Sequence, residues 1–455
     1  MIYENIRKLI KKTYKKIKYQ LSSDVIFLSF VMFICILNFY FYTAENKEKR
    51  TYNSTNLPAI VIDYNTMGFV ARPIILMNNN RYIFTSKSKI SLRVGQNIIV
   101  QGIIENYALD GSFDQYLISL GIVGEIDVQN IYIYPDCNLN CQFFSVLNQV
   151  KNNYSKNYSN WFCSDDKKYW FANLVNCTDL AGLAVGFSIG GSQNLTDNTK
   201  QNFKHLGLTH LIAVSGFQVV LMVDIANQFS ERIQMNSLLR RFLQITLIVG
   251  LILIVGIQAP VLRAGISGMI KIFSEMIGRK ISTLRNLIWA AIILVFWNPA
   301  MLLSLSFQLS FAATLGLILL PNFSFLNSEK IPNFIKELIS AFLTSLAATL
   351  WTLPLIVQIN GKISGLSVFV NVLVSPFISF STILAFFGQI PILGELFTII
   401  NSGILIIILN IVEIFAKINI FINFDKFGVG EMVGYYGFMM LIIFGLGKIS
   451  KEKSE

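Results

Sequence analysis

The sequence predicts a polytopic α-helical membrane protein that carries one small all-β domain, and three observations lead to this fold class. The composition is strongly apolar: 53% of the 455 residues are hydrophobic and 14% are charged, whereas soluble domains carry roughly 25% charged residues. Apolar runs near or above the roughly 18 residues that span a bilayer recur through the second half of the chain. Polar and acidic residues are concentrated in one block, residues 44–165.

The N-terminus predicts a basic cytoplasmic tail over residues 1–24 and a first transmembrane helix over residues 25–43. The apolar run is long for a signal peptide, and the charged residues 45–50 follow it in place of a small-residue cleavage site. We therefore expect an uncleaved span whose N-terminus lies in the cytoplasm, as the positive-inside rule requires.

Residues 44–165 predict an extracytoplasmic β domain. Short runs rich in β-branched and aromatic residues alternate with turn clusters of Asn, Gly and Ser, a spacing that is typical of a small barrel or sandwich. We favour an OB-like barrel. The expected strands are residues 58–63, 68–76, 81–85, 97–105 and 123–134.

After an amphipathic interfacial connector at residues 166–208, the sequence predicts nine more spans and a tail at residues 450–455. The basic breaks between spans alternate with neutral ones, so every basic break falls inside when the N-terminus is inside. This pattern predicts about ten transmembrane helices in the cytoplasmic (inner) membrane, with both termini cytoplasmic. The spans of the 209–449 domain are expected at 209–228, 241–259, 261–278, 284–298, 300–320, 337–358, 365–390, 399–421 and 432–449.

Charge and composition exclude several functions. The net charge of +11 follows from cytoplasmic loops and does not by itself indicate a nucleic-acid partner. Only two histidines are present, which excludes a binuclear hydrolase built on several imidazoles. The chain has no nucleotide-binding or dinucleotide-binding motif. We expect no enzyme activity, no catalytic residues, no metal and no cofactor.

Four of the five cysteines fall in or just after the water-facing block and are candidates for disulfides if that block is outside the cytoplasm. Three pairings are possible, and the sequence does not choose among them. A zinc site at the first two is the alternative, although no histidine lies nearby. The four cysteines are Cys137, Cys141, Cys163 and Cys177.

Polar side chains interrupt two apolar segments. Before the first of them, Thr196 or Asp197 can cap a short amphipathic helix at the outer membrane interface, and Gly207 can end it. The span that follows carries His210, Ser215, Gln218 and Asp224, which suit a pore lining or an ordinary helix–helix contact equally well.

The second segment places Arg263 and Lys271 in an apolar context, where a cation costs about 2.5–3.5 kcal/mol on insertion scales. Such a side chain faces water or a partner, or Arg263 extends to the interface from the start of its helix. Ala264 and Gly268 form a small-x-x-x-small pair that allows close helix contact. Further along, Gln308 is a polar residue in mid-span, where interhelical contact is its ordinary role. Asn371 precedes Pro376, which should break or kink its helix.

In combination these segments resemble the ComEC family of competence proteins, the inner-membrane channel for incoming single-stranded DNA. The run Leu-Gly-Leu-Thr-His-Leu-Ile-Ala-Val-Ser-Gly at residues 206–216 is close to the family signature. Pro-Val-Leu-Arg-Ala at 260–264, Trp-Asn-Pro at 297–299 with Ser-Phe-Gln-Leu-Ser-Phe at 306–311, the 371–376 segment and residues 112–124 are similar to the family as well.

The resemblance covers most of residues 55–400 and implies uptake of single-stranded DNA in natural transformation. The implied partners are the DNA, the bilayer, a cytoplasmic helicase or ATPase, a DNA receptor and a separate nuclease. The implied residues of a DNA path are Ser188, His210, Ser215, Gln218, Asp224, Arg263, Lys271, Gln308 and Asn371.

Three departures from the family pattern stand out. Many members end in a metallo-β-lactamase-like domain, which is not expected here because the chain stops soon after its last span. Gln218 stands where a histidine is common, and Gly-Phe-Ser at 186–188 replaces a Gly-Asp-Arg pattern. The alternatives to a DNA channel are a transporter or flippase for another substrate, and an assembly scaffold without a pore.

Overall fold

The computed structural model describes most of the chain after residue 50, and the predictions for residues 1–24 and 25–43 lie outside the described residues. The described ranges are 51–65, 72–77, 80–85, 92, 96–107, 117–118, 122–133, 139–163, 175–191, 195–212, 216–256, 258–319, 332–390, 393–418, 420–424 and 429–452.

Five strands form a closed barrel, which confirms the five strand predictions. The strand order is β1-β2-β3-β5-β4, and every pair is antiparallel except β3 with β5. Closure removes the open edges that a five-stranded sheet would otherwise expose. The strands are β1 Thr51–Asn65, β2 Arg72–Met77, β3 Asn80–Thr85, β4 Asn97–Asn106 and β5 Ile122–Ile133.

Alternate residues of the strands fill the barrel, as the two-residue period of a strand requires. Val61, Ile75 and Val100 are fully buried there. Gly102 stands at a register shift between β4 and β5, where a Cβ would collide with the Asp127 carbonyl group, so only glycine fits.

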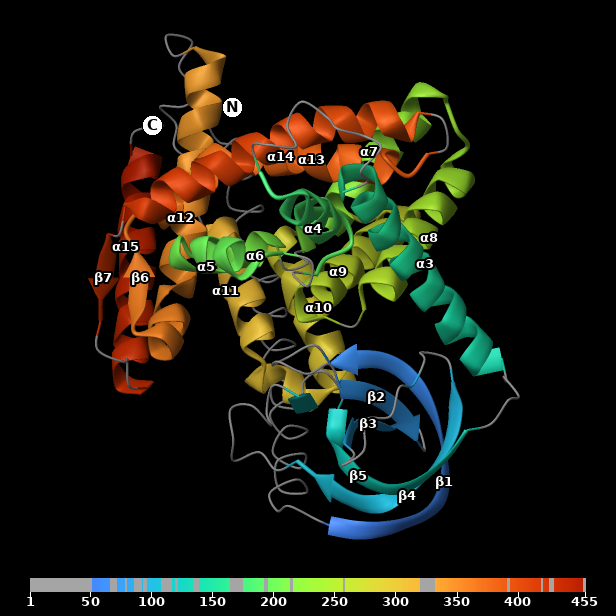
Figure 1. Ribbon diagram of the computed structural model, residues 1–455. Helices are drawn as coiled ribbons and strands as arrows, with labels where there is room; N and C mark the ends of the chain where they lie inside the picture. The colour runs from blue at the N-terminus through green and yellow to red at the C-terminus, as the bar shows by residue number, and fades with distance from the viewer. Residues whose placement is uncertain are drawn as a thin grey trace.

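Helix α3 (Leu139–Cys163) connects the barrel to the helical body and packs along α4 (Cys177–Ser188). Figure 1 shows the barrel at one end of the molecule, with α3 extending from it toward the central α4. A disulfide joins Cys163 to Cys177. Tyr154 and Tyr158 of α3 both donate hydrogen bonds to the Ala385 carbonyl oxygen, at 3.0 and 2.5 Å.

The helical body is built of helices in the region where the spans are expected. Among the described residues four helices, α8, α12, α13 and α14, are long and apolar enough to cross a membrane, and α4, α10 and α11 are shorter apolar helices. The elements are α5 Asp197–His205, α6 Thr209–Ile212, α7 Gly216–Arg232, α8 Ser237–Val255, α9 Ala259–Met276, α10 Thr283–Trp297, η1 Pro299–Leu303, α11 Leu305–Leu319, α12 Asn333–Asn360, β6 Lys362–Ser364, α13 Ser367–Phe387, α14 Gly394–Lys417, β7 Phe421–Asn423 and α15 Val429–Glu452. This is a mostly helical membrane protein, and the total of ten spans stays a prediction.

The span expected at 209–228 falls on two described helices. Helix α6 ends at Ile212 and α7 begins at Gly216, and residues 213–215 between them lie outside the described residues. The absence of a side chain at Gly216 lets α7 start against α9, since a Cβ there would lie 2.7 Å from Ala264 Cβ. A break or kink is expected at Pro376; the helix is not broken there, because α13 runs without interruption from Ser367 to Phe387.

The largest core cluster surrounds α4, whose residues Asp179–Ser188 are all buried. Helices α3, α6, α13 and α14 pack around it. The segment 166–208, expected as an interfacial connector, therefore supplies a central core helix as well as the short helix α5. Thr196 caps α5, and Gly207 follows it with a φ of 71°, as the sequence predicts.

Candidate functional site: a polar cavity among the helices

A cavity of about 1110 Å³ lies among α5, α6, α7, α9, α11, α12, α13 and the β6–β7 pair. It is larger than the roughly 300–1,000 Å³ usual for a small-molecule site. The described residues that line it lie between Gln201 and Phe421 in the sequence.

Three helices present polar stripes to this cavity. The residues of each stripe recur every three or four positions, so they share one helix face. The stripes are Ser306, Ser310 and Thr314 on α11, Ser345, Thr349 and Thr352 on α12, and Ser367, Asn371, Ser375 and Ser379 on α13.

Several of these hydroxyls donate to a carbonyl oxygen one turn earlier in their own helix. Thr314 donates to Ser310, Thr349 to Ser345 and Ser379 to Ser375, at 2.8, 2.9 and 3.0 Å. Such bonds satisfy the hydroxyl hydrogens and leave oxygen lone pairs for water or a passing solute. The wall is therefore polar without depending on one fixed ligand.

Arg263 of α9 supplies the central positive charge of the cavity wall. Its Nε donates to Ser310 Oγ of α11 at 2.8 Å, and the side chain is half-buried. Within the described part of the chain it forms no ion pair with a carboxylate. The charge is therefore not neutralised by a neighbouring acid and is available to an anion in the cavity.

The cavity lining also includes Lys204 and His205 from α5, and His210 from α6. His210 Nδ1 lies 3.1 Å from the Gly207 carbonyl oxygen, which can only accept, so this nitrogen carries a proton. No Asp or Glu is among the described residues that line the cavity. A cleft lined by one sign of charge concentrates counterions of the other sign, so this cavity is suited to an anion.

Helices α12 and α13 are joined at the cavity by a side-chain hydrogen bond, in which Asn371 Nδ2 donates to Ser345 Oγ at 2.8 Å. Gln218 of α7 is 2% exposed and also lines the cavity. The structure thus brings together four of the nine residues proposed from the sequence: His210, Gln218, Arg263 and Asn371.

Four others do not line the cavity, each for a local reason. Ser188 is fully buried and donates to the Ala184 carbonyl oxygen of its own helix at 2.7 Å. Gln308 donates to the Leu302 carbonyl oxygen at 2.8 Å, which holds η1 against the start of α11. Asp224 and Lys271 are exposed, six and eight residues beyond Gln218 and Arg263 on the same helices. Ser215 lies outside the described residues.

The sequence reasoning missed Lys204, His205 and most of the hydroxyl stripes. The signal was present in the spacing, because Ser306, Ser310 and Thr314 stand four residues apart within an apolar helix. A Ser or Thr every four residues is a helix-period pattern like any other amphipathic face.

The small residues of α9 serve close contact, but with two different helices. Ala264 meets Gly216 of α7, whereas a Cβ at Gly268 would lie 3.1 Å from Ile248 of α8. Of the four candidate cysteines, Cys163 and Cys177 form the disulfide, Cys137 lies outside the described residues, and Cys141 lies in α3. Among the described residues no group of three or more His, Cys, Asp or Glu gathers as a metal site would.

Fold and cavity together define a class: a helical membrane protein with a five-stranded barrel and a cation-bearing polar cavity inside its helical body. The family described as "Competence protein" matches residues 187–448. This match spans more than half of the chain and every described residue that lines the cavity. The chain belongs to this family.

Three relatives share part of the sequence. ComE operon protein 3 of Bacillus subtilis is 27% identical over 214 residues, which cover 46% of this chain and 26% of that protein. An uncharacterized protein of Aquifex aeolicus is 28% identical over 286 residues, covering 61% and 63% of the two chains. Uncharacterized protein MG316 of Mycoplasma genitalium is 23% identical over 252 residues, covering 55% and 63%.

The matched region therefore spans less than two thirds of each of these relatives. No solved structure matches the chain.

Proposed function

We propose that this protein is a channel for the uptake of single-stranded DNA across the cytoplasmic membrane in natural transformation. The observation that carries the proposal is the cavity, which has Arg263 and Lys204 in its wall and no carboxylate among its described lining residues. The family membership supports the same conclusion.

The physical requirements of the substrate agree with this wall. A nucleic acid presents one negative charge per nucleotide, and Lys and Arg that neutralise phosphates supply most of its sequence-independent affinity. A channel must admit every sequence, so contacts with the backbone are preferred over readout of bases. Hydroxyl stripes and a few cations supply such contacts without fixing one base at one position.

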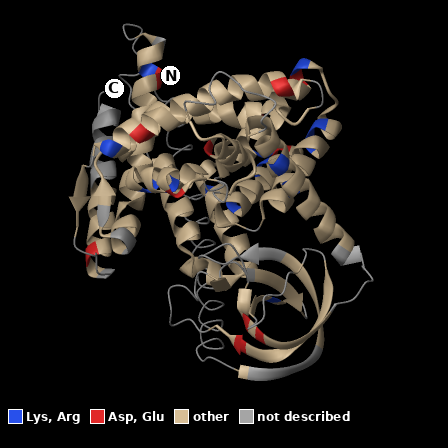
Figure 2. Cartoon of the chain, viewed as in Figure 1, with Lys and Arg blue, Asp and Glu red and all other residues tan. Residues whose placement is uncertain are grey.

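The barrel is proposed to be an OB-like domain within residues 44–165, ahead of a channel domain at 209–449. The closed order of its five strands supports this. Glu105, Glu125 and Asp127 belong to β4 and β5, and Figure 2 shows Asp and Glu positions on the described strands of the barrel. Because carboxylates repel phosphates, the surface formed by β4 and β5 suits a spacer or assembly platform better than a binding surface for DNA.

The disulfide supports an orientation. Disulfides persist in oxidising compartments, so Cys163 and Cys177 are proposed to lie on the outer side, together with α3 and the barrel. The N-terminus and C-terminus are then cytoplasmic, with about ten spans in the inner membrane. A membrane-impermeant thiol reagent should label these two cysteines in intact cells only after a reductant is added; labelling that requires lysis would contradict the orientation.

Energy and strand processing are proposed to come from partners. Because the sequence has no nucleotide-binding motif, a cytoplasmic helicase or ATPase would pull the strand. A DNA receptor would deliver it, and a separate nuclease would remove the complementary strand.

The decisive experiment is uptake of labelled DNA by a deletion strain that carries the gene on a plasmid. Arg263→Gln should reduce uptake at least about tenfold at normal protein level. It removes a cation that no carboxylate neutralises, and the lost attraction to a phosphate in the cavity should exceed about 1.4 kcal/mol. Arg240→Gln is the matched control, because Arg240 pairs with Glu231 on the surface at 3.1 Å.

The two alternatives give different results. A transporter or flippase for another substrate predicts normal transformation and loss of a lipid or polysaccharide in the deletion strain. A scaffold without a pore predicts that Arg263→Gln and Arg263→Glu leave uptake unchanged. Either result would end the proposal of a DNA path through this cavity.

A further inference from the structure

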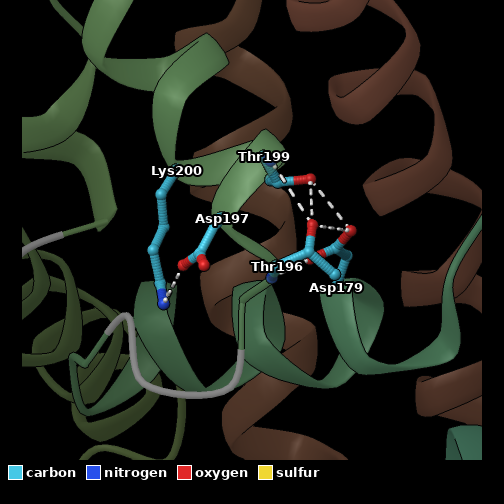
Figure 3. A network of polar contacts seen from close by, with 5 residues as sticks. All are labelled: Asp179, Thr196, Asp197, Thr199 and Lys200. Carbon is cyan, nitrogen blue, oxygen red and sulfur yellow. Dashed lines mark hydrogen bonds and ion pairs between the residues drawn. The ribbon is translucent and has the colours of Figure 1, made fainter. Parts of the chain in front are cut away.

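Asp179 is a carboxylate buried in the core of the helical body, where it is 3% exposed. Its Oδ1 accepts the backbone N–H of Thr196 at 2.7 Å. Its Oδ2 accepts the hydroxyls of Thr196 and Thr199 at 3.0 and 2.9 Å. Figure 3 shows the three residues meeting where α5 begins. Both carboxylate oxygens of Asp179 therefore accept hydrogen bonds from the start of α5.

This position stabilises a negative charge that would otherwise be expensive to bury. Asp179 is in the first turn of α4, and its oxygens contact the N-cap residue of α5, Thr196. The N-terminus of a helix carries a partial positive charge, so two helix dipoles favour the same carboxylate. Bonds from Thr196 and Thr199 to a charged acceptor are also stronger than bonds between neutral groups.

Helix α5 has two faces with different roles. Thr199 and Phe203, four residues apart, are buried, and Phe203 is fully enclosed in the core cluster around α4. Gln201, Lys204 and His205 instead line the cavity. A rotation or shift of this nine-residue helix would move all three away from the wall. The anchor at its first turn therefore determines where the cations at its last turn stand.

We propose that Asp179 is a positioning residue that fixes α5 so that Lys204 and His205 face the cavity. This inference rests on the proposed function for its biological meaning, but its geometric content can be tested separately.

The geometric test uses a cysteine at position 204. The full-length protein with Lys204→Cys is labelled with a water-soluble maleimide, and the unsubstituted protein gives the background from its native cysteines. Asp179→Ala should change the labelling rate at this cysteine by about tenfold, because it removes three bonds to a charged acceptor. Asp179→Asn keeps the shape and one acceptor oxygen, so its rate should stay within about threefold of the parent.

Asp197→Ala is the matched control. Asp197 belongs to the first turn of α5 and pairs with Lys200 at 3.4 Å, but its side chain is 94% exposed. An exposed pair of this kind contributes little, so the labelling rate should not change. If Asp179→Ala also leaves the rate unchanged in a folded protein, the positioning role is overturned.

DNA uptake is then measured with Lys204 intact. Asp179→Ala should reduce it about tenfold and Asp179→Asn far less, in the same order as the labelling. If labelling changes and uptake does not, the positioning role stands and the proposed function of the cation wall fails. Should Asp179→Ala not accumulate in the membrane, Thr199→Val decides the question: it removes one donor at nearly constant volume, and an unchanged labelling rate in this variant would overturn the proposal.

Discussion

Arg263 and Ser310 are joined by a hydrogen bond of 2.8 Å that links α9 to α11 across the wall of the cavity. The bond orients the guanidinium and occupies only its Nε, so the terminal nitrogens keep their donors. It also couples the one half-buried cation of α9 to a hydroxyl stripe on a neighbouring helix.

This pair gives the first prediction. Ser310→Ala should lower DNA uptake a few-fold, because a hydrogen bond to a charged group contributes about 1.5–3 kcal/mol, partly replaced here by water. Combined with Arg263→Gln it should add nothing further, since contacting residues are not additive. Ser306→Ala, one turn earlier on the same stripe, is the control and should have little effect. Additive losses would show that Ser310 does not act through Arg263.

A second prediction concerns the sign of charge in the cavity. Asn371→Asp changes the side chain from neutral to negative at nearly constant shape. At an effective dielectric constant near 20, a charge about 10 Å from a phosphate costs roughly 1.7 kcal/mol, so uptake should fall at least about tenfold. Asn236→Asp, at the exposed N-cap of α8 where Asp caps as well as Asn, should leave uptake near the parental level. Equal uptake by both variants would argue against an anion path beside Asn371.

The third prediction follows from Pro354 in α12. Proline has no N–H, so the carbonyl of Leu350 lacks its helical donor, and Tyr435 of α15 donates to that oxygen at 3.0 Å. Tyr435→Phe should therefore destabilise the protein by about 1–3 kcal/mol, measured as a lower melting temperature in detergent.

Tyr436→Phe is the built-in comparison. Tyr436 donates to the Trp351 carbonyl oxygen at 3.0 Å, but that oxygen keeps its regular helical donor, the N–H of Leu355. The loss should be smaller than for Tyr435→Phe, and the reverse order would refute the explanation through Pro354.

A fourth prediction concerns close packing between α11 and α12. A Cβ at Gly316 would lie 2.5 Å from the Trp351 ring, so Gly316→Ala should force the helices apart and cost about 1–3 kcal/mol. Gly250 in α8 has open space around it, and Gly250→Ala should be neutral or stabilising by up to about 1 kcal/mol. Thermal unfolding of the two variants side by side checks the contrast, which fails if both shift in the same direction.

The fifth prediction concerns the disulfide. It closes a loop between residues 14 positions apart, and a loop of that length corresponds to about 3 kcal/mol in the chain-entropy treatment. Cys163→Ser should lower the melting temperature, and dithiothreitol should lower that of the parent but not of the variant. A parent that is insensitive to reductant would contradict a stabilising role for this bond.

Most of the described elements follow from local patterns in the sequence. Strand alternation and turn clusters depend on neighbouring residues, so all five barrel strands were located within a few positions, although β1 begins seven residues earlier than expected. The cap at Thr196 and the end near Gly207 were also predictable, because capping is decided within one helical turn. Of the break or kink expected at Pro376, the break is absent, since α13 continues through that residue.

Which polar side chains face the cavity depends on how helices that are distant in the sequence pack together. Arg263 and Lys271 are both cations on α9, and nothing in the sequence distinguishes which of them faces the cavity. Only Arg263 reaches the cavity, because α7 and α11 flank its turn of the helix, whereas Lys271 is exposed. The importance of Asp179 was likewise hidden, since its partners lie 17 and 20 positions away at the start of another helix. Hydropathy and capping are local properties that a sequence records directly, whereas the face that a buried charge presents depends on how helices distant in the chain pack against one another.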